Sequence, residues 1–211
     1  MSNRVSIDAR GIQEADDAYE RGLQYLANSI EPQQLSLACV NDVVRHILDL
    51  LETAAELVNT DSRYPYAIFF SVTALEECTK ALAAVGARGR GHFGGCKKLH
   101  NHQFKQCMSV SPSFHCGSRL SVEEWKMRYE EFWHKARTSG FADERSNSIY
   151  FSLNGSGVTI PSQRFKKEDV VNFVLFATEA VEDNLLSVTS DVDVVLKGIE
   201  RIWRNVYDHA V

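Results

Sequence analysis

The sequence predicts an all-α fold, a helical bundle with one small β-hairpin inserted near residues 148–161. Two observations lead to this prediction. Apolar residues recur every three or four positions along most of the chain, which is the period of one face of a helix. Only four prolines and twelve glycines occur in 211 residues, which is few for an all-β sandwich. With 44% hydrophobic residues the chain can build one sizeable core, so we expect a single domain over residues 1–211.

The periodicity places helices along almost the whole chain. An N-terminal helix is expected over residues 12–30 and should end before Pro32. A bundle core is expected over residues 35–190 and a C-terminal helix over residues 191–209. Within the core, apolar stripes predict helices over residues 35–58, 65–85, 97–108, 121–136 and 166–188. The helix expected over residues 121–136 opens with a capping-box pattern, in which Glu124 lies three positions after Ser121.

Two stretches depart from the helical period. Apolar and polar residues alternate over residues 149–153 and 158–160, on either side of Asn154-Gly155-Ser156-Gly157. This is the pattern of a hairpin with a glycine-rich turn. Residues 86–95 hold five of the twelve glycines, and we expect a mobile loop there.

The charges are unevenly distributed. A formal net charge of −5 argues against a protein that coats nucleic acid without sequence preference. From Cys78 to Val122, however, the chain contains no acid and carries these cations: Lys80, Arg88, Arg90, Lys97, Lys98, Lys105 and Arg119. Within this basic segment we expect nucleic-acid contacts at Lys97, Lys98, Arg88 and Arg90.

The N-terminal residues predict neither a secretory signal nor a transit peptide, because they lack an apolar segment and carry acids early. No apolar run reaches the roughly 18 residues that a membrane span needs, so we expect no membrane partner. Five cysteines, an odd number, fit a reducing compartment. We therefore expect a cytoplasmic protein.

Three charged residues interrupt the otherwise apolar helix expected over residues 65–85. Glu76, Glu77 and Lys80 share one arc of this helix with Phe69. The arc is either the wall of a polar site or a solvated strip with an ordinary pair of charges four residues apart. The residues alone leave both interpretations open.

A second group of candidates lies in the short helix expected over residues 97–108. Lys98, His102 and Lys105 fall on one face of such a helix, which suits a phosphate or another anion. Histidine is the side chain most easily poised as a general base near neutral pH. The alternative is a basic surface face without a ligand.

A metal site is a further alternative, because seven His and Cys residues fall within residues 92–116. Their spacings do not match the paired Cys-x-x-Cys arrangement of structural zinc sites. A zinc ion would have these candidate ligands: Cys96, His100, Cys107 and Cys116. Because of these spacings we expect no metal. We expect no other cofactor either, since the sequence contains no phosphate-binding loop and no dinucleotide fingerprint.

Three motifs follow one another in a fixed order. They are YPYAIFFSVTALEECTK, then KLHNHQFK after the glycine-rich segment, and then ERSNSIYFSLNGSGVTIPSQRF ahead of a helix. Over about residues 35–185 this order resembles the AbiV family of bacterial abortive-infection, or phage-defence, proteins. The motif positions of that family fall here on Glu76, Glu77, Lys80, His102, Lys105, Arg145 and Tyr150. From the resemblance we expect the basic side chains to meet around Glu76 and Glu77 in one polar cluster, which is either catalytic or purely structural.

The AbiV family is similar in turn to the wider HEPN superfamily of helical domains, many of which are metal-independent ribonucleases. Their usual mark is an Arg followed after four to six residues by a His on a late helix. Arg204, Asn205 and His209 fit this spacing and form an alternative catalytic set.

The resemblance implies an abortive-infection effector, either an endoribonuclease or a translation-blocking toxin. In the enzyme, a His removes the proton of a ribose 2′-OH and a nearby Arg or Lys stabilises the charge that gathers on the phosphate. The alternative function is that of a non-catalytic effector that binds a phage or host protein. We also expect a homodimer, paired through the apolar N-terminal and C-terminal helices.

Overall fold

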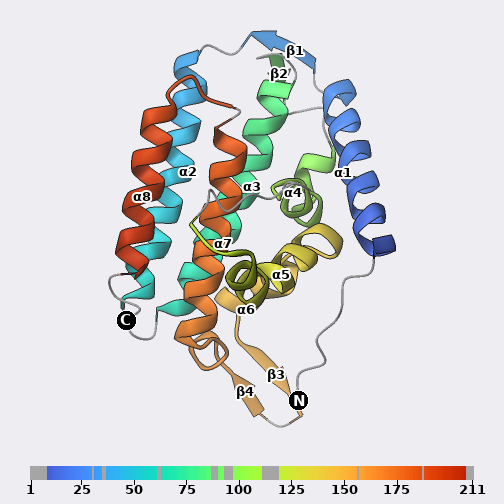
Figure 1. The fold of residues 1–211 in the computed structure, drawn as a ribbon. Helices are drawn as coiled ribbons and strands as arrows, with labels where there is room; N and C mark the ends of the chain where they lie inside the picture. Colours follow the sequence, from blue (N-terminus) through green and yellow to red (C-terminus); the bar gives the residue numbers. More distant parts are fainter. Residues whose placement is uncertain are drawn as a thin grey trace.

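A helical bundle forms the body of the protein (Figure 1). The computed structural model describes residues 9–29, 31–34, 37–60, 63–86, 90–92, 97–110, 119–155, 157–186 and 188–207. Four long helices pack side by side, and the apolar periodicity predicted each of them: α2 (Leu37–Val58), α3 (Tyr64–Gly86), α7 (Lys167–Leu185) and α8 (Val192–Tyr207). Among them α3 is central, because it packs against both α2 and α7. Helix α8 also packs against α2 and α7, on the side away from α3. The prediction of a mostly helical fold is confirmed.

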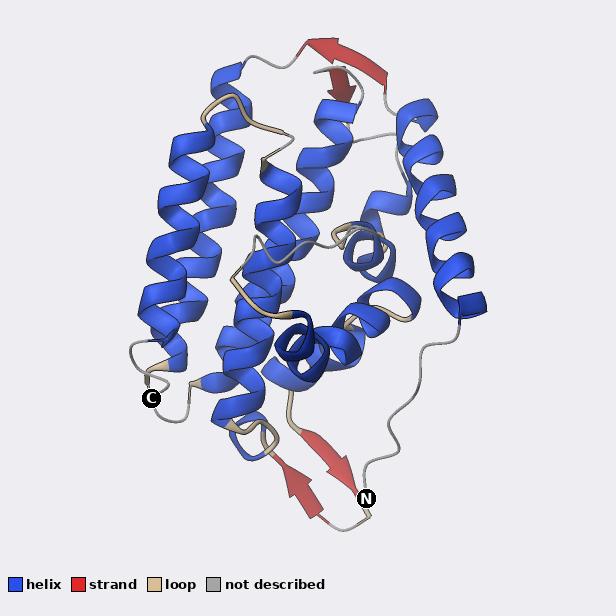
Figure 2. Ribbon diagram, viewed as in Figure 1, coloured by secondary structure: helices blue, strands red, loops and turns tan. Residues whose placement is uncertain are grey.

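Further helices pack beside α3 and α7 on the remaining side of the bundle (Figure 2). They are α1 (Ala9–Ser29), α4 (His102–Met108), α5 (Val122–Thr138) and α6 (Ala142–Ile149), with a 3₁₀ turn, η2 (Lys97–His100), ahead of α4. The apolar side of α1 packs within the chain, since Leu26 is buried in a small cluster with Ala83, Leu99 and Met108. Arg137 of α5 also binds Asp16 of α1, at 3.0 Å.

The main core lies between the long helices and is rich in aromatic side chains. Phe141 lies at the start of α6 and packs edge to face on Phe173 of α7, with ring centroids 4.9 Å apart. Phe176, one turn further along α7, also contacts Phe141. These three side chains are almost completely buried, and edge-to-face pairs of this kind add stability beyond the burial of area. The contact fixes the start of α6, which carries Arg145.

The predicted hairpin is present as β3 (Ser152–Asn154) and β4 (Gly157–Thr159), which pair antiparallel. Sequence reasoning missed α6, which occupies the residues just before it. It also missed a second antiparallel pair, β1 (Glu31–Gln34) with β2 (Arg90–His92). The mobile loop expected over residues 86–95 thus contains a strand. Its partner lies far away in the sequence, and local periodicity carries no signal of such pairing.

The predicted helix boundaries hold to within a few residues, with one instructive exception. The helix expected over residues 97–108 is a 3₁₀ turn followed by α4, because Asn101 interrupts it as an N-cap. The capping box at Ser121 is present as predicted. In the part of the chain that the structure describes, no helix is both long and apolar enough to cross a membrane.

Candidate functional site

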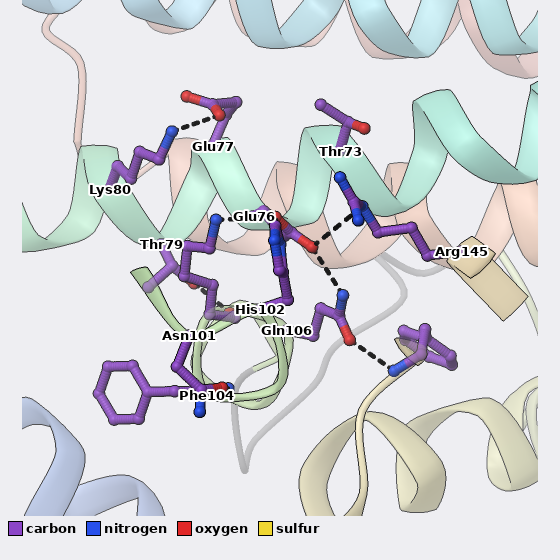
Figure 3. Close-up of polar contacts among 12 residues, drawn as sticks. Thr73, Glu76, Glu77, Thr79, Lys80, Asn101, His102, Phe104, Gln106 and Arg145 are labelled. Carbon is purple, nitrogen blue, oxygen red and sulfur yellow. Dashed lines mark hydrogen bonds and ion pairs between the residues drawn. The ribbon is translucent and has the colours of Figure 1, made fainter. Parts of the chain in front are cut away.

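The buried carboxylate of Glu76, in the middle of α3, lies at the centre of a polar cluster (Figure 3). Glu76 is only 4% exposed. One of its oxygens faces His102 Nδ1 at 2.7 Å and Lys105 Nζ at 2.8 Å. The other accepts a hydrogen bond from Gln106 Nε2 at 2.7 Å and lies 3.7 Å from Arg145 Nε. We call these five residues the Glu76 cluster.

Helix α4 supplies three members of the Glu76 cluster from one face. The Asn101 side chain accepts a hydrogen bond from the Phe104 N–H, which starts the helix at His102. Residues three and four positions further along then point the same way as His102, and these are Lys105 and Gln106. The Thr79 hydroxyl donates to the Lys105 carbonyl at 2.5 Å, so α4 is also fastened to α3 through its backbone.

Two opposing effects act on the pKa of Glu76. Burial alone would raise it, because desolvation disfavours the charged form. Hydrogen bonds from Lys105, His102 and Gln106 outweigh burial and hold the pKa below its ordinary value. Glu76 is therefore ionised at neutral pH and acts as an acceptor for all of its partners.

Sequence reasoning did not identify Gln106. Its side chain is fully buried, and while Nε2 donates to Glu76, Oε1 accepts the backbone N–H of Phe141 at 2.6 Å. The amide thus connects the Glu76 cluster to the start of α6, the helix that carries Arg145. The spacing of four residues from His102 was the available signal, because it places Gln106 on the same face of α4.

The expected cluster included Glu77 and Lys80, and the structure corrects this. The Lys80 ammonium binds the Glu77 carboxylate at 2.5 Å, and both side chains lie across α3 from His102 (Figure 3). Glu77 is one position from Glu76 and therefore points about 100° away from it around the helix axis. Lys80 lies four positions from Glu76, but its flexible side chain turns to Glu77.

The basic residues before α4 also lie differently from the expectation. Lys98 does not share a face with His102, because the 3₁₀ turn ends at His100 and Asn101 separates it from α4. Its ammonium lies instead over the ring of Tyr25, 4.1 Å from the centroid. Of the other expected nucleic-acid contacts, Lys97 is exposed and Arg90 lies in β2. Arg88 falls outside the described residues.

The alternative catalytic set is only partly described. Arg204 is exposed on α8 and pairs with Glu200 one turn earlier, at 2.9 Å. Asn205 accepts hydrogen bonds from Asn59 at its backbone oxygen and its side-chain oxygen, at 3.1 and 3.3 Å. His209 falls outside the described residues. The described part of this set thus contains an exposed ion pair and a contact between two helix ends.

The structure describes two of the four candidate zinc ligands. His100 is exposed, whereas Cys107 is half-buried, and burial raises the pKa of its thiol to about 11. A neutral thiol is a poor metal ligand. Cys96 and Cys116 fall outside the described residues. Among the residues that are described, no group of three His, Cys, Asp or Glu side chains could hold a metal ion.

The Glu76 cluster has the chemistry of an oriented general base. Glu76 is acceptor-only, so His102 presents Nδ1–H to it and has Nε2 as the ring nitrogen that can take a proton. The His102 side chain is 48% exposed, so a substrate can reach it. The Arg145 guanidinium lies against the same carboxylate with 29% of its side chain exposed, which places a cation where an anionic substrate would approach.

Comparison with protein-family models identifies one family. Residues 36–182 match the HEPN_AbiV family, described as AbiV. Neither the search of curated proteins nor the search of solved structures gave a match. The matched region contains every member of the Glu76 cluster, the hairpin, α2 and α3 of the bundle, and α7 as far as residue 182. Since the match covers well over half of the chain, the protein belongs to the AbiV family.

Proposed function

We propose that this protein is an abortive-infection effector that cleaves RNA without a metal ion, with His102 as the general base. Membership in the AbiV family points to an abortive-infection function of the HEPN type. The single observation that carries the enzymatic proposal is the 2.7 Å contact between the buried Glu76 carboxylate and Nδ1 of the exposed His102. A carboxylate in this position fixes the ring orientation and stabilises the imidazolium that forms during proton transfer.

In the proposed reaction, His102 Nε2 takes the proton of a ribose 2′-OH. The 2′ oxygen then forms a bond to the adjacent phosphorus, and the bond from phosphorus to the 5′ oxygen of the next nucleotide breaks. The departing oxygen takes up a proton from water, and the hydroxide left behind takes the proton that His102 holds, which returns His102 to its neutral form. The products are a 2′,3′-cyclic phosphate on one fragment and a 5′-hydroxyl on the other. No oxidant, reductant or metal takes part in these steps.

Arg145 is the group proposed to stabilise the phosphate. Its guanidinium lies over the ring of Phe69, 5.4 Å from the centroid, and close to the Glu76 carboxylate. These two contacts hold the side chain against the same carboxylate that His102 contacts, and 29% of the Arg145 side chain stays exposed. A positioned cation at the atom where negative charge develops typically increases the catalytic rate by a factor on the order of 10²–10³. Lys105 is buried and bound to Glu76, so its role is to keep Glu76 ionised.

A second candidate function is that of a non-catalytic effector that binds a phage or host protein. The observation that favours it is the burial of Lys105 and Gln106, which close the network around Glu76 from one side. Buried ion pairs often serve only the specificity of packing. In this case the Glu76 cluster would fix α3, α4 and α6 in register, and its substitution would change stability without any loss of an intrinsic activity.

The first experiment is cleavage of a mixed RNA substrate by the purified protein in EDTA, before and after addition of an extract from infected cells. We propose that a phage or host protein activates the effector in the cytoplasm, where its RNA substrate lies. The variants are His102→Ala and Arg145→Ala, and product ends are analysed for 2′,3′-cyclic phosphate. We expect cleavage by the wild type, and at least a hundredfold loss in both variants.

Matched controls separate the two candidate sites. His46 is exposed on α2, so His46→Ala should cleave as the wild type does. His209→Ala tests the alternative catalytic set. Loss of cleavage in His209→Ala together with full activity in His102→Ala would move the catalytic centre to the C-terminal helix. Absence of cleavage by the wild type with and without the extract would favour the binding effector.

A further inference from the structure

A cavity of about 290 Å³ lies between α1, α4 and the end of α5. This volume is at the small end of the range for ligand sites, which is about 300–1,000 Å³. The lining includes two aromatic residues, a cysteine, an arginine and two exposed amides: Tyr19, Phe104, Cys107, Arg137, Asn101 and Gln103. Apolar walls with a few polar groups are typical of sites for small molecules. We call this space the α4 cavity.

The α4 cavity exists because α1 presents two small residues to α4. A Cβ at Gly22 would overlap the sulfur of Met108, so the Met108 side chain already fills the space that this glycine leaves. Ala18 lies one turn earlier on the same face of α1. Its side chain lines the α4 cavity, so at this position the space between the two helices stays open.

The α4 cavity lies on a different side of α4 from the Glu76 cluster. Gln103 and Cys107, one turn apart, line the cavity, whereas His102 points to Glu76 on α3. The Phe104 ring also points away from Glu76 (Figure 3). An occupant of the cavity therefore contacts the helix that carries His102 without taking any hydrogen bond from the Glu76 cluster.

Two cations lie close to the aromatic walls. The Arg137 guanidinium lies 4.7 Å from the centroid of the Tyr19 ring, and it is bound to Asp16. The Lys98 ammonium lies 5.4 Å from the centroid of the Phe104 ring and is exposed. Among the residues that the structure describes, Lys98 has no carboxylate partner. Its uncompensated charge favours an anionic occupant.

We propose that the α4 cavity binds one nucleotide, with its base on the Phe104 ring and its phosphate on Lys98. Bases stack on aromatic rings, and their edges pair with amide side chains such as those of Asn101 and Gln103. The volume suits one base with its ribose. This inference goes beyond the proposed RNA cleavage and does not depend on it. A free nucleotide and a nucleotide within single-stranded RNA offer the same base and phosphate.

The methionines provide the test, because the chain has only Met1, Met108 and Met127. In protein labelled with ¹³C at the methionine methyl groups, NMR follows each of them separately. Met108 is 2% exposed and lines the α4 cavity. Met127 is an internal reference, since it lies ten positions before Arg137 on α5, about 15 Å along the helix axis.

The probes are the 5′-monophosphates of adenosine, cytidine, guanosine and uridine, and the four nucleosides without phosphate. We expect at least one monophosphate to shift the Met108 signal in a saturable manner and to leave Met127 unchanged. Loss of the contact between the phosphate and Lys98 should weaken binding of the matching nucleoside about tenfold. Equal binding of nucleoside and monophosphate would overturn the proposal.

Two variants locate the ligand. Lys98→Glu should weaken binding of the monophosphate at least tenfold, because it replaces the cation by a like charge. Phe104→Leu keeps an apolar side chain but removes the stacking surface, and it should weaken binding about tenfold. Lys126→Glu is the matched control, since it makes the same charge change at an exposed position of α5. It should bind as the wild type does, and all variants should retain the wild-type circular dichroism spectrum.

The source of the nucleotide is decided with 2′-O-methyl tetranucleotides of adenine, cytosine and uracil, which have no free 2′-OH and cannot be cleaved by the proposed reaction. A Met108 shift with monophosphates supports the site as one for a free nucleotide. A shift with tetranucleotides alone supports a site for one nucleotide of RNA. No shift with any of these compounds, or shifts that Lys98→Glu and Phe104→Leu leave unchanged, would overturn the proposal. Binding without RNA cleavage would refute only the proposed ribonuclease, and cleavage without a Met108 shift would refute only this inference.

Discussion

Glu76 and Glu77 are neighbours in the sequence and have opposite environments. Glu76 is 4% exposed and balanced by the buried ammonium of Lys105, whereas Glu77 is partly exposed and bound to Lys80. Charged groups that are buried depend on their partners, because removal of one partner leaves the other uncompensated. Exposed pairs contribute little, because water solvates each group by itself. The two residues therefore form a natural pair for comparison.

At the residue scale we predict that Glu76→Leu lowers the free energy of unfolding by about 3–5 kcal/mol, because it leaves Lys105 buried without a counter-charge. Glu77→Leu, on the same helix, should lower it by about 1 kcal/mol or less. Urea denaturation followed by circular dichroism measures both. Equal losses in the two variants would contradict the assignment of Glu76 as the buried centre of the cluster.

At the scale of elements, the turn between α5 and α6 determines where Arg145 lies. Gly140 occupies this turn with a φ of +71°, a conformation that residues with a side chain rarely adopt. A Cβ at Gly140 would lie 2.8 Å from Gln106 Oε1 and 3.3 Å from the Gln103 Cα. The glycine thus lets the chain pass close to α4, where Gln106 holds the first residue of the turn into α6.

We predict that Gly140→Ala destabilises the protein by about 1–3 kcal/mol, through backbone strain and displacement of Gln106. Gly155→Ala in the hairpin turn is the control, because no atom lies within 4 Å of a Cβ built there. It should change the stability by less than about 0.5 kcal/mol. Thermal unfolding distinguishes the two. A neutral Gly140→Ala would show that the turn adapts without strain.

At the scale of the whole molecule, Arg119 connects three parts of the fold. It precedes α5, donates to both Glu179 and Glu182 of α7, and lies over the ring of Trp203 in α8. Glu179 is completely buried, and its second oxygen has no hydrogen-bond partner among the described residues. Burial raises the pKa of Glu179 to about 7; the Arg119 charge lowers it and the Glu182 charge raises it, but burial dominates.

The stability should therefore depend on pH through Glu179. Between its ordinary pKa of 4.5 and about 7, the folded chain holds a proton on Glu179 that the unfolded chain has lost. The contribution to the free energy of unfolding is greatest below pH 4.5 and falls by about 3 kcal/mol as the pH rises to 7. Glu179→Gln should remove this dependence, whereas Glu168→Gln, exposed on the same helix, should retain it. Urea denaturation at pH 5 and pH 8 makes the comparison, and identical pH dependence in wild type and Glu179→Gln would refute it.

The sequence by itself determined most of the helices, the hairpin and much of the candidate site. The apolar period of α2 or α7 is a local property, as is the capping box at Ser121, so neither needs the rest of the chain to be recognised. The order of three motifs also identified Glu76, His102, Lys105 and Arg145 as related residues. That they act in catalysis stays a prediction.

Only the tertiary structure decided which of these side chains meet. It separated Glu77 and Lys80 from Glu76 and added Gln106. It also paired β1 with β2, and it buried Glu179 against Arg119. Each of these outcomes depends on the direction of a side chain or on a contact between residues far apart in the sequence. A helical period specifies which face of a helix is buried, but it does not specify the partner against which that face packs.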